Sequence, residues 1–314
     1  MNSEKKHIDI LCVGEALIDF IGTQVEESID KTKNFHRYLG GSPTNVAMNM
    51  GRLGLNVAMV ATVGTDGFGD YILNRLRETN ISTTHINKID DHPTSVIFVN
   101  RTIHTPEFIA MRGADPFIVE TQIPDTILGQ IKLFHTSCFA LSKPPARQTI
   151  LSKAAQAKAA GCQLSIDINY SKQIWPETKD AVEVISKYCS LSPLVKVSQD
   201  DIDRLFGNGM SHDEIFTNLH SLGASLVCLT LGNKGAKLSE AGKPVLELSA
   251  LKVDNIMDAT GAGDAFWSGF LFSWIKGKDN QISMETALKM ASIKLQNVGR
   301  IPDYALIISN VLNS

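Results

Sequence analysis

Short apolar runs rich in β-branched residues recur along the chain, and they predict the strands of one large sheet. These runs show little alternation between polar and apolar positions, which is the pattern of strands covered on both faces, as in a parallel sheet. The predicted strands span residues 8–13, 56–63, 131–136, 163–168, 194–198 and 225–231.

Segments with the spacing of amphipathic helices lie between most of these strands. In one of them, Ser42 is expected to cap a helix over residues 43–53, with Pro43 in its first position and Gly54 after its end. A second helix is predicted over residues 145–160. The alternation of strands and helices predicts an α/β fold with a doubly wound, mostly parallel sheet flanked by helices.

Two segments, residues 17–39 and 94–111, break this alternation because they contain strand-like runs with no helix between them. We expect them to form a small second sheet inserted in a single domain of residues 1–314. Open α/β sheets bind ligands at the carboxyl ends of their strands, so a sheet placed there would act as a lid that excludes water. The pattern alone also fits an ordinary surface hairpin.

Composition and charge narrow the range of functions. The chain is 43% hydrophobic and carries a formal net charge of −3, with its basic residues dispersed, so neither nucleic acid nor a membrane is an expected partner. The cysteines include no CxxC pair and the histidines no HxxxH or HxH pair, which favours neither zinc nor redox chemistry. The start of the chain does not have the pattern of a secretion signal, so a cytoplasmic location is expected.

The most informative stretch reads Asp258-Ala-Thr-Gly261-Ala262-Gly263-Asp264 and is followed by an apolar, helix-prone run. Its small residues leave the backbone accessible at the start of a helix, where free amide groups and the helix dipole favour an anion. A carboxylate beside an anion site is unfavourable unless it faces another group. We therefore expect Asp264 to face a hydroxyl that attacks the anion. A tight turn with an acidic helix start is the alternative.

Three further glycine-rich segments lie next to predicted strands or helices. Residues 40–45 (Gly-Gly-Ser-Pro-Thr-Asn) offer a sugar bare amides and the donor and acceptor of Asn45. Residues 64–70 resemble a phosphate loop but lack the P-loop and GxGxxG spacings, so a strand-to-helix connection is favoured. Residues 230–235 predict a turn between two strands that a nucleotide could cover, with Lys234 near its phosphates. Taken alone, each segment also fits a purely structural turn or cap.

Together these motifs, in this order along nearly the whole chain, resemble those of the ribokinase-like (PfkB-type) carbohydrate kinases. The resemblance implies phosphorylation of a sugar hydroxyl by ATP with the help of Mg²⁺. It implies that Asp264 is the catalytic base and that the amides of Gly261, Ala262 and Gly263 form the hole for the transferred phosphoryl group. It also implies that the two inserted segments form the β lid of that family.

The resemblance extends to residues that bind the two substrates. Sugar-binding positions of the family correspond to Asp19, Gly41, Asn45, Arg112 and Asn169. Nucleotide-binding positions correspond to Thr230, Gly232, Lys234, Gly235 and Asn297. Some relatives dimerise through their lids, and we expect a homodimer here to use Ile21, Phe35, Ile97, Val99 and Phe108.

Three segments depart from the family pattern. Ser198 and Asp201 replace the Asn and Glu that organise metal and phosphate in many relatives, which reduces Asp201 to an indirect magnesium contact through water. Ser171 stands where fructokinase and ketodeoxygluconate kinase relatives often carry Arg, and Lys172 is the substitute one position later. Residues 297–302 lack the glycine- and alanine-rich pattern linked to a monovalent-cation site, so a requirement for potassium is left open.

The resemblance does not fix the acceptor. Fructose giving fructose 6-phosphate is the leading expectation, from the segments around Arg112 and Asn169. The alternatives are 2-keto-3-deoxygluconate and 5-dehydro-2-deoxygluconate. A non-catalytic sugar or nucleotide sensor with a kinase fold is a competing interpretation, motivated by Ser198 and Asp201. A dinucleotide-dependent oxidoreductase is disfavoured because GxGxxG is absent after the first strand.

Overall fold

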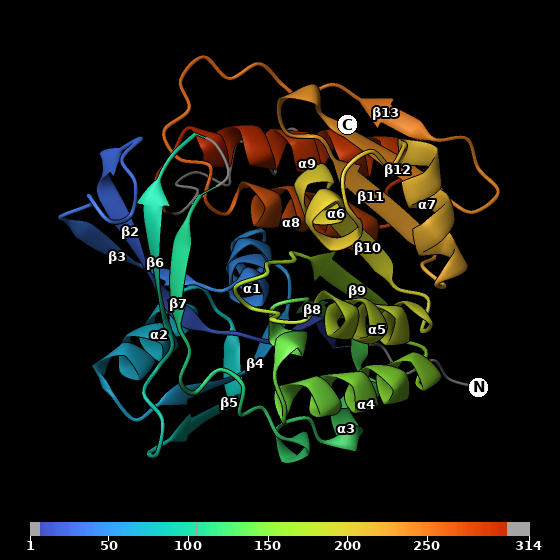
Figure 1. The fold of residues 1–314 in the computed structure, drawn as a ribbon. Coiled ribbons are helices and arrows are strands. Elements are labelled where there is room, and N and C mark those ends of the chain that lie inside the picture. The colour runs from blue at the N-terminus through green and yellow to red at the C-terminus, as the bar shows by residue number, and fades with distance from the viewer. Residues whose placement is uncertain (1–6, 104–105, 300–314) are drawn as a thin grey trace.

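The computed structural model describes residues 7–103 and 106–299, and its centre is a nine-stranded sheet (Figure 1). The strand order is β13-β12-β11-β10-β9-β8-β1-β4-β5. Neighbouring strands pair in parallel except β11 with β12 and β12 with β13. The strands are β1 (Ile8–Val13), β4 (Val57–Gly64), β5 (Ser82–Ile89), β8 (Ile131–Ser137), β9 (Gln163–Ile168), β10 (Leu194–Ser198), β11 (Leu226–Thr230), β12 (Ala236–Glu240) and β13 (Leu246–Leu248).

Helices cover both faces of this sheet. Along β1, Leu11 and Val13 join a core with α4 to α7, whereas Ile10 and Cys12 join a core with α1, α2, α8 and α9. Because β1 lies between its parallel partners β4 and β8, the strand order reverses there, and the predicted doubly wound fold is confirmed. The helices are α1 (Ser42–Arg52), α2 (Gly67–Arg77), α3 (Asp125–Leu128), α4 (Ala146–Ala159), α5 (Thr178–Cys189), α6 (Gln199–Phe206), α7 (His212–Ser221), α8 (Ala262–Ile275) and α9 (Asn280–Leu295).

Strand β5 was not among the predicted strands. It forms the edge of the large sheet beyond β4, and its sequence STTHINKI holds no fully buried residue. An edge strand that is open to solvent needs few apolar side chains, so its sequence lacks the continuous apolar run that marks the inner strands.

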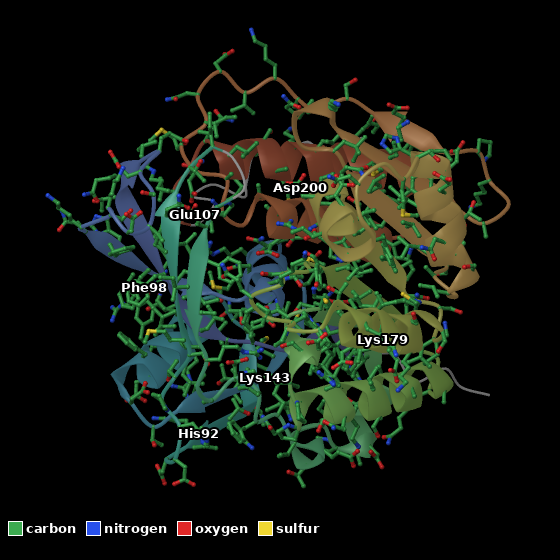
Figure 2. All side chains as sticks on the ribbon, viewed as in Figure 1. His92, Phe98, Glu107, Lys143, Lys179 and Asp200 are labelled. Carbon is green, nitrogen blue, oxygen red and sulfur yellow. The ribbon has the colours of Figure 1, made fainter. Side chains whose placement is uncertain are left out.

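A second, four-stranded sheet stands beside the first, at the left of Figure 1. Its order is β3-β2-β6-β7, which confirms the small sheet expected from the two inserted segments. We call it the lid, although its action as a lid stays a prediction. One face packs on α2, because the ring of Phe20 lies 5.1 Å from that of Phe98 (labelled in Figure 2) and 5.8 Å from that of Phe68. The lid strands are β2 (Leu17–Val25), β3 (Phe35–Gly40), β6 (Val96–Arg101) and β7 (Phe108–Met111).

The residues expected at a lid dimer interface divide into two groups. Ile21 and Val99 are buried within their own chain, so they are not available to a partner. Phe35, Ile97 and Phe108 are partly exposed. The lid homodimer stays a prediction.

All five cysteines are buried and free, and lie between the strands and helices of the two cores. Among the described residues, none of the helices combines the length and the apolar character needed to cross a bilayer.

Asp66 joins the lid to the large sheet. It caps α2, because its Oδ1 accepts hydrogen bonds from the amides of Phe68 (3.0 Å) and Gly69 (2.9 Å). Its Oδ2 accepts one from the amide of Thr94 at 2.7 Å, just before β6 begins. Segment 64–70 is therefore a strand-to-helix connection, as predicted. Partial burial raises the pKa of Asp66, but these hydrogen bonds outweigh it and hold the pKa below the usual carboxyl value.

Asp66→Ala is expected to destabilise the fold by about 1–2 kcal/mol, because it removes a helix cap and the bond to Thr94. Urea unfolding at pH 7 measures the loss. Because the folded-state pKa lies below the unfolded one, the contribution is present above the unfolded pKa and is lost as pH falls through the folded pKa. The control is Asp70→Ala, an exposed carboxylate on the same helix that pairs with Lys88. Equal losses for both variants would contradict the proposed role.

Candidate active site

The first turn of α8 carries the catalytic candidates. Gly261 precedes the helix in a left-handed backbone conformation (φ 75°), which glycine adopts freely. The amide of Ala262 donates to the carbonyl oxygen of Ala259 at 3.1 Å, so the turn itself uses it. Within the described residues, no acceptor takes the amides of Gly261 and Gly263. The anion hole predicted with three amides therefore has two free donors in this structure.

Asp264 lies in the same turn and is held by the start of α1. Its Oδ1 accepts a hydrogen bond from the hydroxyl of Ser42 at 2.7 Å, and its Oδ2 accepts one from the side-chain amide of Asn45 at 2.8 Å. Ser42 is the first residue of α1 and Gly41 is the N-cap, so the predicted capping role of Ser42 is wrong. The first turns of two helices thus meet at one carboxylate, where their dipoles favour negative charge.

The charge of Asp264 is balanced between opposing influences. Burial raises its pKa above the usual carboxyl value, while the bonds from Ser42 and Asn45 and the ammonium groups of Lys196 and Lys294 act in the opposite direction. A carboxylate with a raised pKa is a stronger proton acceptor, provided that it remains ionised at the working pH.

Asp19 of β2 lies on the opposite side of its strand from Phe20 and borders the same site. A Cβ on Gly40 would lie 2.2 Å from its Oδ2, so the Asp19 side chain can occupy this position only because residue 40 is glycine. Burial, and after it the charges of Asp264 and Asp258, raise the pKa of Asp19 to about 7. Near neutral pH its carboxyl group can donate or accept a hydrogen bond.

Glu15 supports the turn before α1, and the sequence analysis did not identify it. Its Oε1 accepts a hydrogen bond from the amide of Ser42 at 2.9 Å, and its Oε2 accepts one from the hydroxyl of Ser137 at 2.8 Å. Gly41 (φ 101°) packs directly on Glu15, because a Cβ there would lie 2.2 Å from the Glu15 carbonyl oxygen. Burial raises the pKa of Glu15 to about 8. The sequence signal that could have identified Glu15 was a carboxylate placed soon after a predicted buried strand.

A buried ion pair lies on the other side of the anion hole. Nζ of Lys196 on β10 is 3.0 Å from both carboxylate oxygens of Asp167, its register partner on β9. Burial opposes the charge of Lys196, but Asp167 and Asp201 outweigh it and raise its pKa, so the ammonium group stays charged. A Cβ on Gly263 would lie 2.9 Å from this Nζ, which places positive charge beside the free amides. The sequence analysis did not identify this ion pair, although charged residues inside predicted buried strands were a signal for it.

Arg112 and Asn169 both contact Phe139, so each already has protein partners. Nε of Arg112 donates to Oδ2 of Asp115 at 3.0 Å, and its guanidinium lies 4.4 Å from the ring centre of Phe139. Oδ1 of Asn169 accepts a hydrogen bond from the amide of Phe139 at 3.1 Å. Because the Arg112 side chain is only 5% exposed, its contact with a sugar stays a prediction.

The predicted nucleotide turn is a β-hairpin between β11 and β12, with a short 3-10 turn η3 (Gly232–Lys234) at its tip. Gly235 (φ 104°) must be glycine, because a Cβ there would lie 2.0 Å from the carbonyl oxygen of Leu248. Thr230 ends β11 in register with Ser198 of β10, one strand away from the ion pair. Asn297 lies after α9 and has its carbonyl oxygen 3.1 Å from Nζ of Lys294.

Asp201, the candidate for an indirect metal contact, is already satisfied by protein groups. Its Oδ2 accepts hydrogen bonds from the hydroxyl (2.5 Å) and the amide (3.3 Å) of Ser198, and Arg204 lies 3.1 Å from its Oδ1. Among the described residues, no group of three or more His, Cys, Asp or Glu side chains could hold a metal ion. Asp201 could therefore reach a metal ion only through water, and this contact stays a prediction.

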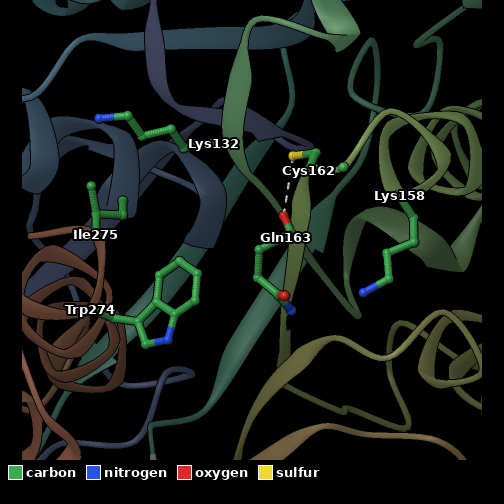
Figure 3. A pocket seen from close by; sticks show the side chains of 7 residues that line it. Lys132, Lys158, Cys162, Gln163, Trp274 and Ile275 are labelled. Carbon is green, nitrogen blue, oxygen red and sulfur yellow. Dashed lines mark hydrogen bonds between the residues drawn. The ribbon is translucent and has the colours of Figure 1, made fainter. Parts of the chain in front are cut away.

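Two cavities lie at opposite ends of the large sheet. One of about 320 Å³ is lined by Asp19, Asn45 and Gly261, and so belongs to the site. The other, of about 490 Å³, is lined by Lys132 and Gln163 among others (Figure 3). These two residues lie at the beginnings of β8 and β9, away from the carboxyl ends of the strands. The larger cavity is therefore not part of the catalytic site.

The doubly wound sheet, the small second sheet and a carboxylate beside a helix-start anion hole define a ribokinase-like kinase of small molecules. The chain belongs to the pfkB family of carbohydrate kinases, because the model described as "pfkB family carbohydrate kinase" matches residues 7–305. It is therefore a sugar kinase, and the sensor and oxidoreductase interpretations are set aside.

Proteins similar to this chain carry names that refer to different acceptors. It is 34% identical over 300 residues to an ATP-dependent 6-phosphofructokinase of Thermoanaerobacterium thermosaccharolyticum, covering 96% of this chain and 92% of that protein. It is 27% identical over 297 residues to the 5-dehydro-2-deoxygluconokinase of Bacillus subtilis, covering 92% and 89%. The solved fructokinase of Halothermothrix orenii matches with a TM-score of 0.76 and 31% identity, over 94% of this chain and 100% of that one.

Asp264→Asn is expected to lower kcat for sugar-dependent ADP formation by about 10²–10⁴-fold, because the amide cannot accept the hydroxyl proton. Calorimetry should find ATP bound with nearly unchanged affinity. In the unchanged protein, kcat should fall as pH falls through the raised pKa of Asp264, whose charged neighbours include Lys196, Lys294, Asp19 and Asp167. Turnover that survives in the variant would exclude Asp264 as the base.

Proposed function

We propose that this protein transfers the γ-phosphoryl group of ATP to a hydroxyl group of a hexose, with fructose as the leading acceptor and fructose 6-phosphate as its product. The observation that carries the proposal is the position of Asp264. Its carboxylate is held by Ser42 and Asn45 at the start of one helix and lies beside the free amides at the start of another. This is the arrangement that an attacking hydroxyl and a transferred phosphoryl group require.

In the proposed reaction, Asp264 accepts the proton of the attacking hydroxyl, while Ser42 and Asn45 keep its two oxygens in position. The amides of Gly261 and Gly263 stabilise the negative charge of the phosphoryl group during transfer. Because the carboxylate and the amides occupy one turn, they act at opposite ends of the same in-line displacement.

The nucleotide is proposed to lie over the hairpin of β11 and β12 and the end of α9, at Thr230, Gly232, Lys234, Gly235 and Asn297. The register of β11 with β10 supports this position, because it sets the hairpin beside the strand that carries Lys196. Mg²⁺ would supply positive charge that offsets the charge of the nucleotide phosphates. Asp201 would reach that ion only through water, since its oxygens already accept protein hydrogen bonds.

The sugar is proposed to bind Asp19, the backbone of Gly41, and Asn45, with Arg112 and Asn169 at the other side of the site. Contacts between the lid and the catalytic turn support closure over the sugar. Nε of Arg101, at the end of β6, donates to the carbonyl oxygen of Met257 at 3.0 Å. The amide of Ala259 donates to the carbonyl oxygen of Thr102 at 3.4 Å. Lid position and the geometry of residues 257–261 are therefore linked.

Fructose 6-phosphate is a second candidate acceptor, which would make the product a bisphosphate. The 34% identical relative named ATP-dependent 6-phosphofructokinase favours it. Arginines also favour it, because Arg37 of β3, Arg52 of α1 and Arg75 of α2 line the cavity that contains Asp19. Arg75 also pairs with Glu78, so Arg37 is the stronger candidate. The guanidinium of Arg37 stacks 3.8 Å above the ring centre of Tyr71, which leaves its N–H groups to bind a phosphate at the edge of the site.

An acceptor panel with Mg-ATP tests the proposed function. The panel contains fructose, 2-keto-3-deoxygluconate, 5-dehydro-2-deoxygluconate and ribose. Fructose is expected to give a kcat/KM at least about tenfold higher than the other three, because the proposed site binds a neutral sugar through hydrogen bonds. Fructose 6-phosphate is measured beside it, and a higher kcat/KM for the phosphorylated sugar selects the second candidate. ADP formation that no sugar stimulates would contradict the proposal.

Arg37→Gln separates the two fructose acceptors. If the cavity binds a phosphate group, the variant should raise KM for fructose 6-phosphate by about tenfold or more and change KM for fructose by less than about twofold, because one charged hydrogen bond is lost. Steady-state kinetics with both sugars measures the ratio. Arg77→Gln, an exposed arginine on α2, is the control. Equal losses for both acceptors would mean that Arg37 only positions Tyr71.

A further inference from the structure

Lys294 is a second buried lysine beside the catalytic turn. It lies in the last turn of α9, and its side chain is only 6% exposed. Its Nζ is 3.1 Å from the carbonyl oxygen of Asn297 and 3.6 Å from Oδ2 of Asp258, whose side chain is fully buried. A charged group is removed from water only at a large free-energy cost, so this position calls for an explanation.

The neighbours of Lys294 connect it to the anion hole. Oδ1 of Asp258 accepts a hydrogen bond from the amide of Thr260 at 3.0 Å, whereas its Oδ2 has no hydrogen-bond partner in the described part of the chain. The amide of Met257 donates to the carbonyl oxygen of Leu295 at 2.8 Å, which fastens the turn to the end of α9. A Cβ on Gly261 would lie 3.5 Å from Cε of Lys294, so the end of the lysine side chain packs against the residue that carries a free amide.

The ammonium group of Lys294 balances negative charges that surround it. Burial lowers the pKa of Lys294, and the carboxylates of Asp258, Asp264 and Asp19 act against that change. These three carboxylates surround a site that must also receive the phosphates of ATP. Within the described residues, Lys294 is the cation on this side of the turn that interacts with all three carboxylates.

From this geometry we infer that Lys294 is the built-in monovalent cation of the catalytic turn. Its ammonium group, held by one carbonyl and one carboxylate oxygen, orients residues 258–261 and offsets the negative charge around the transferred phosphoryl group. The reaction therefore needs no free potassium or ammonium ion. The inference rests on the proposed phosphoryl transfer, and Lys294 is a positioning residue because it does not touch the reacting atoms.

The first test compares cations at constant ionic strength, with tetramethylammonium as the inert salt. Adding KCl or NH4Cl should change kcat of the unaltered protein by less than about twofold. Lys294→Ala should lower kcat by about 10²-fold with a smaller effect on KM for the sugar, and NH4Cl or KCl should restore part of the rate saturably by entering the vacated space. Tenfold activation of the unaltered protein by potassium, or a variant that neither loses activity nor responds to cations, would overturn the inference.

A double variant separates this role from simple neutralisation of a buried charge. Lys294→Met leaves Asp258 buried and unpaired, whereas Lys294→Met with Asp258→Asn removes both charges. The double variant should recover thermal stability but not kcat. The acid limb of its pH profile should lie above that of the unaltered protein, because Asp264 has lost a nearby cation. Recovery of kcat would reduce Lys294 to a structural partner of Asp258. The matched control is Lys153→Met, a buried lysine paired with Asp125 on α3.

A binding measurement needs no acceptor and so separates failure of this inference from failure of the proposed function. Calorimetry with ADP and with AMP-PNP, a non-hydrolysable ATP analogue, should show that Lys294→Met weakens the triphosphate analogue about tenfold more than ADP. Equal weakening of both nucleotides would overturn the inference even if the kinase assay succeeds. The predicted difference would support it even if no sugar in the panel is phosphorylated.

Discussion

The hydrogen bonds that Asp264 accepts from Ser42 and Asn45 are the contacts on which the active site depends. Their partners are 222 and 219 residues apart in sequence, so only the complete doubly wound sheet brings them together. Once α1 and α8 begin at the same point, the carboxylate is fixed by one helix and the free amides of Gly261 and Gly263 are presented by the other. A base and an anion hole can then act within one turn, because the carboxylate faces the attacking hydroxyl group while the amides face the phosphoryl group.

Three buried charged residues surround the point where α1 and α8 begin. Glu15 holds the turn before α1, Lys196 borders Gly263, and Lys294 lies behind Gly261. Buried ion pairs add little net stability, because removing two charges from water offsets most of their attraction. Their concentration around one carboxylate is therefore better explained by what they do to the charge of the site than by a contribution to folding.

Local signals made most of the fold and the catalytic turn predictable from the sequence. Apolar runs mark inner strands, and a glycine such as Gly235 marks a close backbone approach. Pairings across the sheet were not predictable, because periodicity does not give strand order. Lys196 and Asp167 were visible inside buried strands, but only the register of β9 with β10 makes them partners. The local sequence around Ser42 is that of a helix cap. Its side chain instead donates a hydrogen bond to Asp264, which lies on a helix more than two hundred residues away in sequence.

The proposed mechanism places reaction chemistry and acceptor choice on different parts of this molecule. In the proposed mechanism, proton acceptance and phosphoryl binding rest on backbone amides and one carboxylate at the start of α8, which tolerate little change in geometry. The cavity beside them is completed by side chains of β2, β3, α1 and α2, including Asp19, Arg37 and Arg75. Substitutions there can alter the charge offered to an acceptor without moving the catalytic turn. The relatives named for different acceptors at comparable identity are consistent with this separation. The same separation explains why the catalytic turn identifies the reaction, while the acceptor has to be read from the cavity.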